Sequence, residues 1–201
     1  NKMKFIQTEQ EVGERGLVIV GDFFSPLKLL HLVMGPVNAV YFLMEQPEFA
    51  RIIMEIHEKN QLDLVRQAVS NGVRVIMSMD NLDTMFHPPE YVEAYSASFY
   101  EKAAAICHEY GALFFIHACG NQKDNLKLIS SLKVDGLEGV AFPPLGDVGL
   151  DEAMQMTSED FIITGGISAI ETRDLKTRKE VFEYVENLFS KMKPYRNRFI
   201  L

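Results

Sequence analysis

Short apolar runs alternate with helix-patterned stretches about six times along this chain, and this alternation constrains the fold more than any other feature. Each run is apolar along most of its length, which is typical of strands buried on both faces of a parallel sheet by helical crossovers. The sequence therefore predicts an α/β fold with parallel strands. The predicted strands lie at 16–24, 73–80, 113–119, 135–140, 161–167 and 198–201.

Between these runs, apolar residues recur at three- and four-residue spacing, which predicts helices. Pro47 suits the first turn of a helix, because the N–H that proline lacks would be unpaired there in any case. Gly111 follows the end of another helix, where glycine is favoured. The predicted helices lie at 26–35, at 40–71 with a new start at Pro47, within 88–112, and at 122–133, 151–157 and 178–194.

Two architectures have alternating strands and helices, an open doubly wound sheet and a (β/α)8 barrel. No Gly-x-Gly-x-x-Gly motif follows a strand, so the dinucleotide-binding open sheet has no support. Polar or special residues instead stand at five successive strand ends, which favours a barrel, where strand ends converge on one mouth. These residues are Asp22, Asp80 with Asn81 and Asp83, His117 with Cys119, Glu138, and Gly165 with Gly166.

A complete barrel averages about 250 residues, and this sequence has 201 with six predicted strands. The first residue is Asn rather than Met, and the last three, "FIL", read as the start of a strand that is cut off. We therefore expect one barrel domain over residues 1–201, truncated at both ends and representing the later part of the barrel.

Composition excludes several classes of function. The formal net charge of −8 argues against nucleic acid as a partner. No apolar run approaches the roughly 18 residues that a transmembrane helix needs, and no signal peptide is visible. Two cysteines do not make a disulfide framework, so a cytoplasmic location is expected.

His117 and Cys119 form the strongest chemical motif. Side chains at positions i and i+2 of a strand point to the same side, and imidazole and thiolate are preferred zinc ligands. A core histidine beside an inert buried cysteine is the alternative. Two ligands do not complete a catalytic zinc site, and Cys107 reads as a packed residue in mid-helix. The third ligand would be Glu138 or a residue outside this sequence.

The stretches "FFIHACGN", "VDGLEGV", "FIITGGIS" and "RNRFIL" resemble the uroporphyrinogen decarboxylase superfamily, and within it the cobalamin-dependent methyltransferases. The resemblance implies a (β/α)8 barrel in which His-x-Cys at one strand end and a cysteine after the last strand bind zinc. His117 and Cys119 match the first two ligands. The third position would lie beyond Leu201. The superfamily also suggests a homodimer.

The resemblance implies a zinc-dependent methyltransferase with a corrinoid (cobalamin) carried on a partner protein. Zinc lowers the pKa of a bound thiol or polarises a methylated donor. The methyl group would move between the corrinoid and a small-molecule donor or a thiol acceptor, with the corrinoid protein docked at the barrel mouth.

The remaining strand-end residues are candidates for the same mouth. Asp80 and Glu138 are expected to act in catalysis as polar groups there. The expected substrate-binding residues are Asn81, Asp83, Asn121, Gly165 and Gly166. For the acidic and amide residues, Asx turns or helix caps are the alternative, and for the glycines a tight turn. Asp22 is expected to cap the helix that begins at Pro26, and His87 to be a loop residue.

Two other functions remain open. A metal-free decarboxylase acting on a tetrapyrrole would need arginines at the mouth to hold the substrate carboxylates, and most arginines here lie on predicted helices or helix ends. A non-catalytic barrel that serves as a binding subunit is the second alternative.

Overall fold

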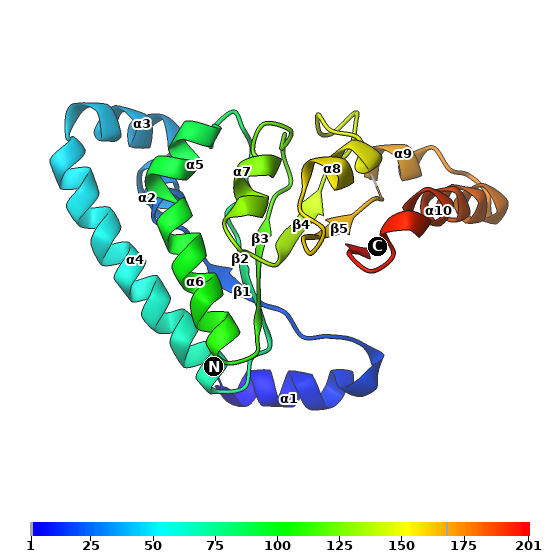
Figure 1. The fold of residues 1–201 in the computed structure, drawn as a ribbon, viewed down its shortest axis with the longest axis horizontal. Coiled ribbons are helices and arrows are strands. Elements are labelled where there is room, and N and C mark those ends of the chain that lie inside the picture. Colours follow the sequence, from blue (N-terminus) through cyan, green and yellow to red (C-terminus); the bar gives the residue numbers. More distant parts are fainter. Residues whose placement is uncertain (1, 168) are drawn as a thin grey trace. The chain divides into compact units, whose positions relative to one another are not determined.

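The computed structural model describes residues 2–167 and 169–201, and its strands and helices alternate as predicted (Figure 1). The strands are β1 (Val20–Phe23), β2 (Val75–Ser78), β3 (Leu113–His117), β4 (Gly136–Val140), β5 (Ile162–Gly165) and β6 (Phe199–Ile200). The helices are α1 (Lys2–Val12), α2 (Pro26–Met34), α3 (Pro36–Glu45), α4 (Pro47–Ser70), α5 (Pro89–Tyr95), α6 (Ala97–Glu109), α7 (Leu126–Ser131), α8 (Leu150–Met156), α9 (Ala169–Arg173) and α10 (Arg178–Met192). Two 3₁₀ turns, η1 (Gly13–Arg15) and η2 (Lys193–Tyr195), follow α1 and α10.

The chain divides into two compact units. Unit 1 holds the residues up to Asp80 together with Tyr91–Phe115, and unit 2 holds Asn81–Glu90 together with Ile116–Leu201. The strand order is β1-β2-β3 in unit 1 and β3-β4-β5-β6 in unit 2. The pairs β1/β2, β4/β5 and β5/β6 are parallel. Parallel neighbours in chain order are what βα repeats produce, because each helix returns the chain to the start of the next strand.

In unit 1, three successive helices begin with proline. Pro26, Pro36 and Pro47 start α2, α3 and α4, which confirms the helix start predicted at Pro47. Figure 1 shows the long helices α4 and α6 side by side, and the two helices are in contact. The buried residues that join α2, α3 and the start of α4 are Leu27, Leu30, Ala39, Leu43, Ala50 and Met54.

Ser25, rather than Asp22, caps α2. The Ser25 hydroxyl accepts a hydrogen bond from the Lys28 N–H at 3.2 Å, so the capping role predicted for Asp22 is wrong. Asp22 is exposed and has a φ of 69° at a register shift between β1 and β2. A cap must sit immediately before the first helical residue, and the irregular end of β1 moves Asp22 out of that place.

Several elements differ from the prediction. The strand predicted at 113–119 ends at His117, so Cys119 lies beyond β3 rather than within it. Helix α1 occupies residues for which we predicted no element, and none of its residues is buried. The stretch 88–112 contains two helices, because Ser96 leaves the helical conformation at a φ of −126° between α5 and α6. Helix α9 follows β5 and was not predicted.

In the part of the chain that the structure describes, no single helix is long and apolar enough to cross a membrane. The bent pair α2 and α3, with 114° between them, passes that test together by length and composition.

Candidate functional site

A histidine and a carboxylate from neighbouring strands meet in unit 2. His117 is the last residue of β3, and Glu138 lies in the middle of β4. The Ala118 N–H donates to the Glu138 carbonyl at 2.8 Å, which keeps the two strands paired just past His117. The His117 Nδ1 and Glu138 Oε2 atoms are 2.5 Å apart. A carboxylate on Nδ1 orients the ring and leaves Nε2 as the nitrogen that can bind a metal.

An irregularity in β4 gives this pair its geometry. The β4/β5 register shifts between Glu138 and Val140, and Gly139 there has a φ of +78°. Such bulges redirect side chains in a sheet. A Cβ at Gly139 would lie 2.8 Å from His117 Cε1, so only glycine leaves room for the imidazole.

Cys119 lies two residues beyond the end of β3 and is an exposed free cysteine. Its thiol and the His117 imidazole are the donor types that zinc prefers, so the two residues fit part of a zinc site. Among residues 2–167 and 169–201, however, no group of three His, Cys, Asp or Glu side chains is placed to hold a metal ion. Cys107 is buried in α6, as predicted.

Two of the predicted substrate-binding residues, Asp83 and Asn121, are brought together in unit 2. Asp83 Oδ2 accepts a hydrogen bond from the Asn121 N–H at 3.2 Å. Asp83 Oδ1 accepts from the Met85 N–H at 2.8 Å, which is the Asx turn that we considered as the alternative. The role of both residues in binding substrate stays a prediction.

Asp80 belongs to unit 1 and is 0% exposed. Its Oδ1 accepts from the Ser25 N–H at 2.9 Å and the Ser78 hydroxyl at 3.2 Å, and its Oδ2 accepts from the Tyr100 hydroxyl. Burial raises the pKa of Asp80, although these hydrogen bonds oppose the shift. Burial and the Asp80 carboxylate likewise raise the pKa of Tyr100. The geometry gives Asp80 a structural role, and its catalytic role stays a prediction.

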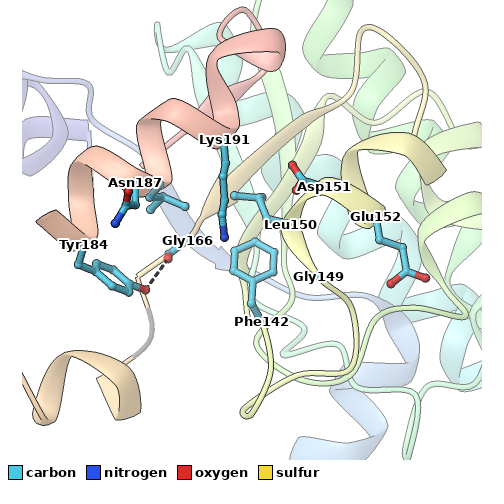
Figure 2. A pocket seen from close by; sticks show the side chains of 10 residues that line it. Phe142, Gly149, Leu150, Asp151, Glu152, Gly166, Tyr184, Asn187 and Lys191 are labelled. Atoms are coloured by element: carbon cyan, nitrogen blue, oxygen red, sulfur yellow. Dashed lines mark hydrogen bonds between the residues drawn. The ribbon is translucent and has the colours of Figure 1, made fainter.

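A cavity of about 560 Å³ opens beside the carboxyl end of β5 in unit 2 (Figure 2). Gly166 lines this cavity, and its carbonyl accepts a hydrogen bond from the Tyr184 hydroxyl at 3.2 Å. Figure 2 shows the Lys191 side chain extending from α10 toward Leu150 and Phe142. The volume lies in the range of small-molecule sites. The lining residues are Phe142, Gly149, Leu150, Asp151, Glu152, Gly166, Tyr184, Asn187, Leu188 and Lys191.

The remaining candidates are Asn81, Gly165 and His87. Asn81 is exposed, with a φ of 49°. A Cβ at Gly165 would lie 2.7 Å from the Val140 carbonyl oxygen, so close approach of β4 and β5 explains this glycine. His87 is a buried loop residue whose carbonyl accepts from the Asn125 side-chain amide at 2.9 Å.

Sequence reasoning missed Tyr100 and the α10 residues of the cavity. The α10 residues recur as Tyr184, Asn187, Leu188 and Lys191, at the spacing of one helix face, and this spacing was a usable signal. Tyr100 had no such signal, because a phenol in an apolar helix also reads as ordinary core packing.

The chain is similar to a known protein family and to a solved structure. The family model described as Uroporphyrinogen decarboxylase (URO-D) matches residues 5–200. No curated protein matches the chain significantly. Among solved structures, a methyltransferase from Methanosarcina mazei superposes with a TM-score of 0.61 at 15% sequence identity. The match covers 78% of this chain and 44% of the methyltransferase chain. This likeness confirms the predicted α/β fold, as part of a (β/α)8 barrel.

Proposed function

The chain belongs to the uroporphyrinogen decarboxylase family, and on that premise we propose that it is a zinc-dependent methyltransferase with a metal site that includes His117 and Cys119. The observation that carries the proposal is the His117–Glu138 pair, with Nδ1 and Oε2 2.5 Å apart. This pair presets the tautomer and direction of an imidazole two residues before an exposed thiol. The fold shared with a Methanosarcina mazei methyltransferase supports the same reaction class.

In this proposal the chain's own residues orient and bind. His117 and Cys119 hold the metal, and Glu138 keeps the imidazole ring in position. Zinc, when bound, supplies a Lewis acid that lowers the pKa of a substrate thiol or polarises a methyl donor. The methyl group passes between a small molecule and a corrinoid on a partner protein, and the cavity beside β5 receives the small molecule.

Metal analysis tests the zinc assignment. The full-length protein is expected to bind about one zinc ion, and Cys119→Ser and His117→Ala are each expected to remove most of it. Cys107→Ala and His108→Ala are the matched controls, because these residues lie on α6, outside the proposed site. Full zinc occupancy in Cys119→Ser, measured by atomic emission on folded protein, would contradict the assignment.

The charged residues that line the cavity predict how strongly an anionic ligand binds there. Glu152 is paired with Lys123 at 2.7 Å, so Lys191 and Asp151 are left to set the charge that a ligand meets among the lining residues described. We expect 3-mercaptopropionate, an anionic thiol, to bind about fivefold more weakly to Lys191→Gln. Asp151→Asn is expected to tighten the same binding, since it removes a like charge.

Binding of both thiols is measured by isothermal titration calorimetry. The neutral 2-mercaptoethanol is the control ligand, and Lys193→Gln is the control variant. Equal weakening of both thiols by Lys191→Gln, or no change in either, would remove the cavity from the proposal. The decarboxylase alternative would need arginines at the barrel mouth, and two of the described arginines are engaged elsewhere: Arg66 pairs with Glu109, and Arg198 donates to the carbonyls of Met154 and Ser158.

A further inference from the structure

We propose that Asp83 is a positioning residue that holds the loop 118–121, and with it Cys119, in the conformation that binds the metal. The inference rests on the proposed function where it concerns zinc. It stands on the geometry of unit 2 where it concerns the loop. Asp83 is followed by the turn that precedes α5, whereas Cys119 follows β3, so the two residues are far apart in sequence.

Main-chain hydrogen bonds tie two segments together on both sides of Cys119. The Leu82 N–H donates to the His117 carbonyl at 3.2 Å, and the Gly120 N–H donates to the Leu82 carbonyl at 3.1 Å. One residue further along, the Thr84 N–H donates to the Asn121 carbonyl at 3.0 Å. The Cys119 backbone is therefore enclosed between bonded neighbours.

The Asp83 carboxylate joins these segments through its two oxygens. Oδ2 accepts from the Asn121 N–H at 3.2 Å, within the loop 118–121. Oδ1 accepts from the Met85 N–H at 2.8 Å, within the turn that contains Asp83 itself. A half-buried carboxylate that accepts one N–H from each segment links the two with charge-assisted hydrogen bonds.

Gly120 shows how closely the Asp83 side chain approaches the loop. A Cβ at Gly120 would lie 2.1 Å from Asp83 Oδ2 and 2.5 Å from Asp83 Cβ. Glycine is thus required at position 120 by lack of space, since the aspartate occupies the volume of any side chain there. Positions 83 and 120 therefore depend on each other, because the Asp83 carboxylate packs on the main chain next to Cys119.

The consequence for metal binding is preorganisation. An exposed loop that is free to move must lose conformational entropy when its thiol binds a metal, and this weakens the affinity. A loop already held by Asp83 avoids most of that cost. Residues that orient metal ligands in this way change affinity by about 10- to 100-fold when they are replaced.

The first test compares two carboxylates that bind neighbouring parts of the same segment. Asp83→Asn keeps the shape of the side chain but places an amide N–H where a carboxylate oxygen met a main-chain N–H. Asp147→Asn is the matched control, because Asp147 Oδ1 accepts from the Gln122 and Lys123 N–H groups at 2.8 and 3.1 Å, just beyond the loop 118–121. Zinc affinity is measured in the full-length protein by chelator competition, and the Cys119 alkylation rate by iodoacetamide and peptide mass analysis.

We expect Asp83→Asn to weaken zinc binding about tenfold and to change the alkylation rate of Cys119, while Asp147→Asn leaves both within about twofold. Gly120→Ala is expected to reproduce the effect of Asp83→Asn. In the double variant Gly120→Ala/Asp83→Gly, the effects of the two single substitutions on zinc affinity are expected to be less than additive. Without the Asp83 side chain, the new Cβ at position 120 no longer clashes with it.

The outcomes separate the two proposals. If the wild-type protein binds no zinc, the proposed function fails, and the alkylation rates alone decide the role of Asp83. If zinc binds but Asp83→Asn and Asp147→Asn weaken it equally, or if Asp83→Asn leaves both measurements unchanged, the positioning role of Asp83 is overturned while the metal site remains.

Discussion

Asp80→Ala is expected to lower the free energy of unfolding by about 3 kcal/mol. The carboxylate is 0% exposed and accepts hydrogen bonds from Ser25, Ser78 and Tyr100. Alanine leaves all three donors buried without their acceptor, and each such loss costs about 1–3 kcal/mol before the burial penalty of the carboxylate itself is subtracted. The measurement is urea unfolding followed by far-UV circular dichroism, since the chain has no tryptophan.

Asp80→Asn is the matched variant for this prediction. Its amide oxygen can still accept from Ser25 and Ser78, and its N–H₂ can donate to the Tyr100 oxygen, so a loss of about 1 kcal/mol is expected. If alanine and asparagine at position 80 destabilise the protein equally, hydrogen bonding to the Asp80 side chain does not hold the start of α2 to the end of β2.

The wild-type protein and Asp80→Asn are also expected to differ in how their stability depends on pH. The folded-state pKa of Asp80 is raised by burial, so between the unfolded-state value of about 3.9 and the raised value the folded protein binds more protons than the unfolded chain. The contribution of Asp80 to stability is therefore most favourable below about pH 3.9 and falls as the pH rises through that window. Asp80→Asn is expected to show a flatter decline in its urea midpoint over the same range. An identical pH profile in both proteins would contradict this.

Gly139→Ala is expected to destabilise the protein by about 2 kcal/mol and to separate His117 from Glu138. A non-glycine residue at positive φ costs roughly 1 kcal/mol, and Gly139 has a φ of +78°. The new Cβ would also lie 2.8 Å from His117 Cε1, so the imidazole must move and the contact with Glu138 Oε2 is lost. The ring ¹⁵N chemical shifts of His117 report the tautomer and the hydrogen bond at Nδ1, so they measure the loss of the contact with Glu138.

Gly111→Ala controls for backbone strain alone. Gly111 has a φ of +67°, and no atom lies within 4 Å of a Cβ built there. We expect Gly111→Ala to lose about 1 kcal/mol of stability and to leave the His117 shifts and the zinc affinity unchanged, whereas Gly139→Ala changes both. If the two variants behave alike, the space at Gly139 has no part in orienting His117.

The strands and most helices could be predicted because their signals are local. Runs such as 113–119 are apolar along most of their length, and proline favours the first turn of a helix, as Pro47 does in α4, whatever the helix packs against. Helix α1 was not predicted, since its apolar residues are few among charged and polar ones, and none of its residues is buried in the fold. The cap of α2 was assigned to the wrong residue because the strand end at Asp22 is irregular, and strand irregularities arise from pairing with the neighbouring strand.

The candidate site divides in the same way. The sequence by itself determined the α/β class, the presence of a strand that covers 113–117, and the presence of an imidazole and a thiol two residues apart. Only the tertiary structure decided that Glu138 lies on Nδ1 of His117, that Asp83 and Gly120 share one space, and that Asp80 is enclosed by Ser25, Ser78 and Tyr100. The physical reason is that periodicity and turn chemistry act between residues a few positions apart. Contacts between residues 20 to 55 positions apart depend instead on strand register, bulges and packing, which no short stretch of sequence encodes.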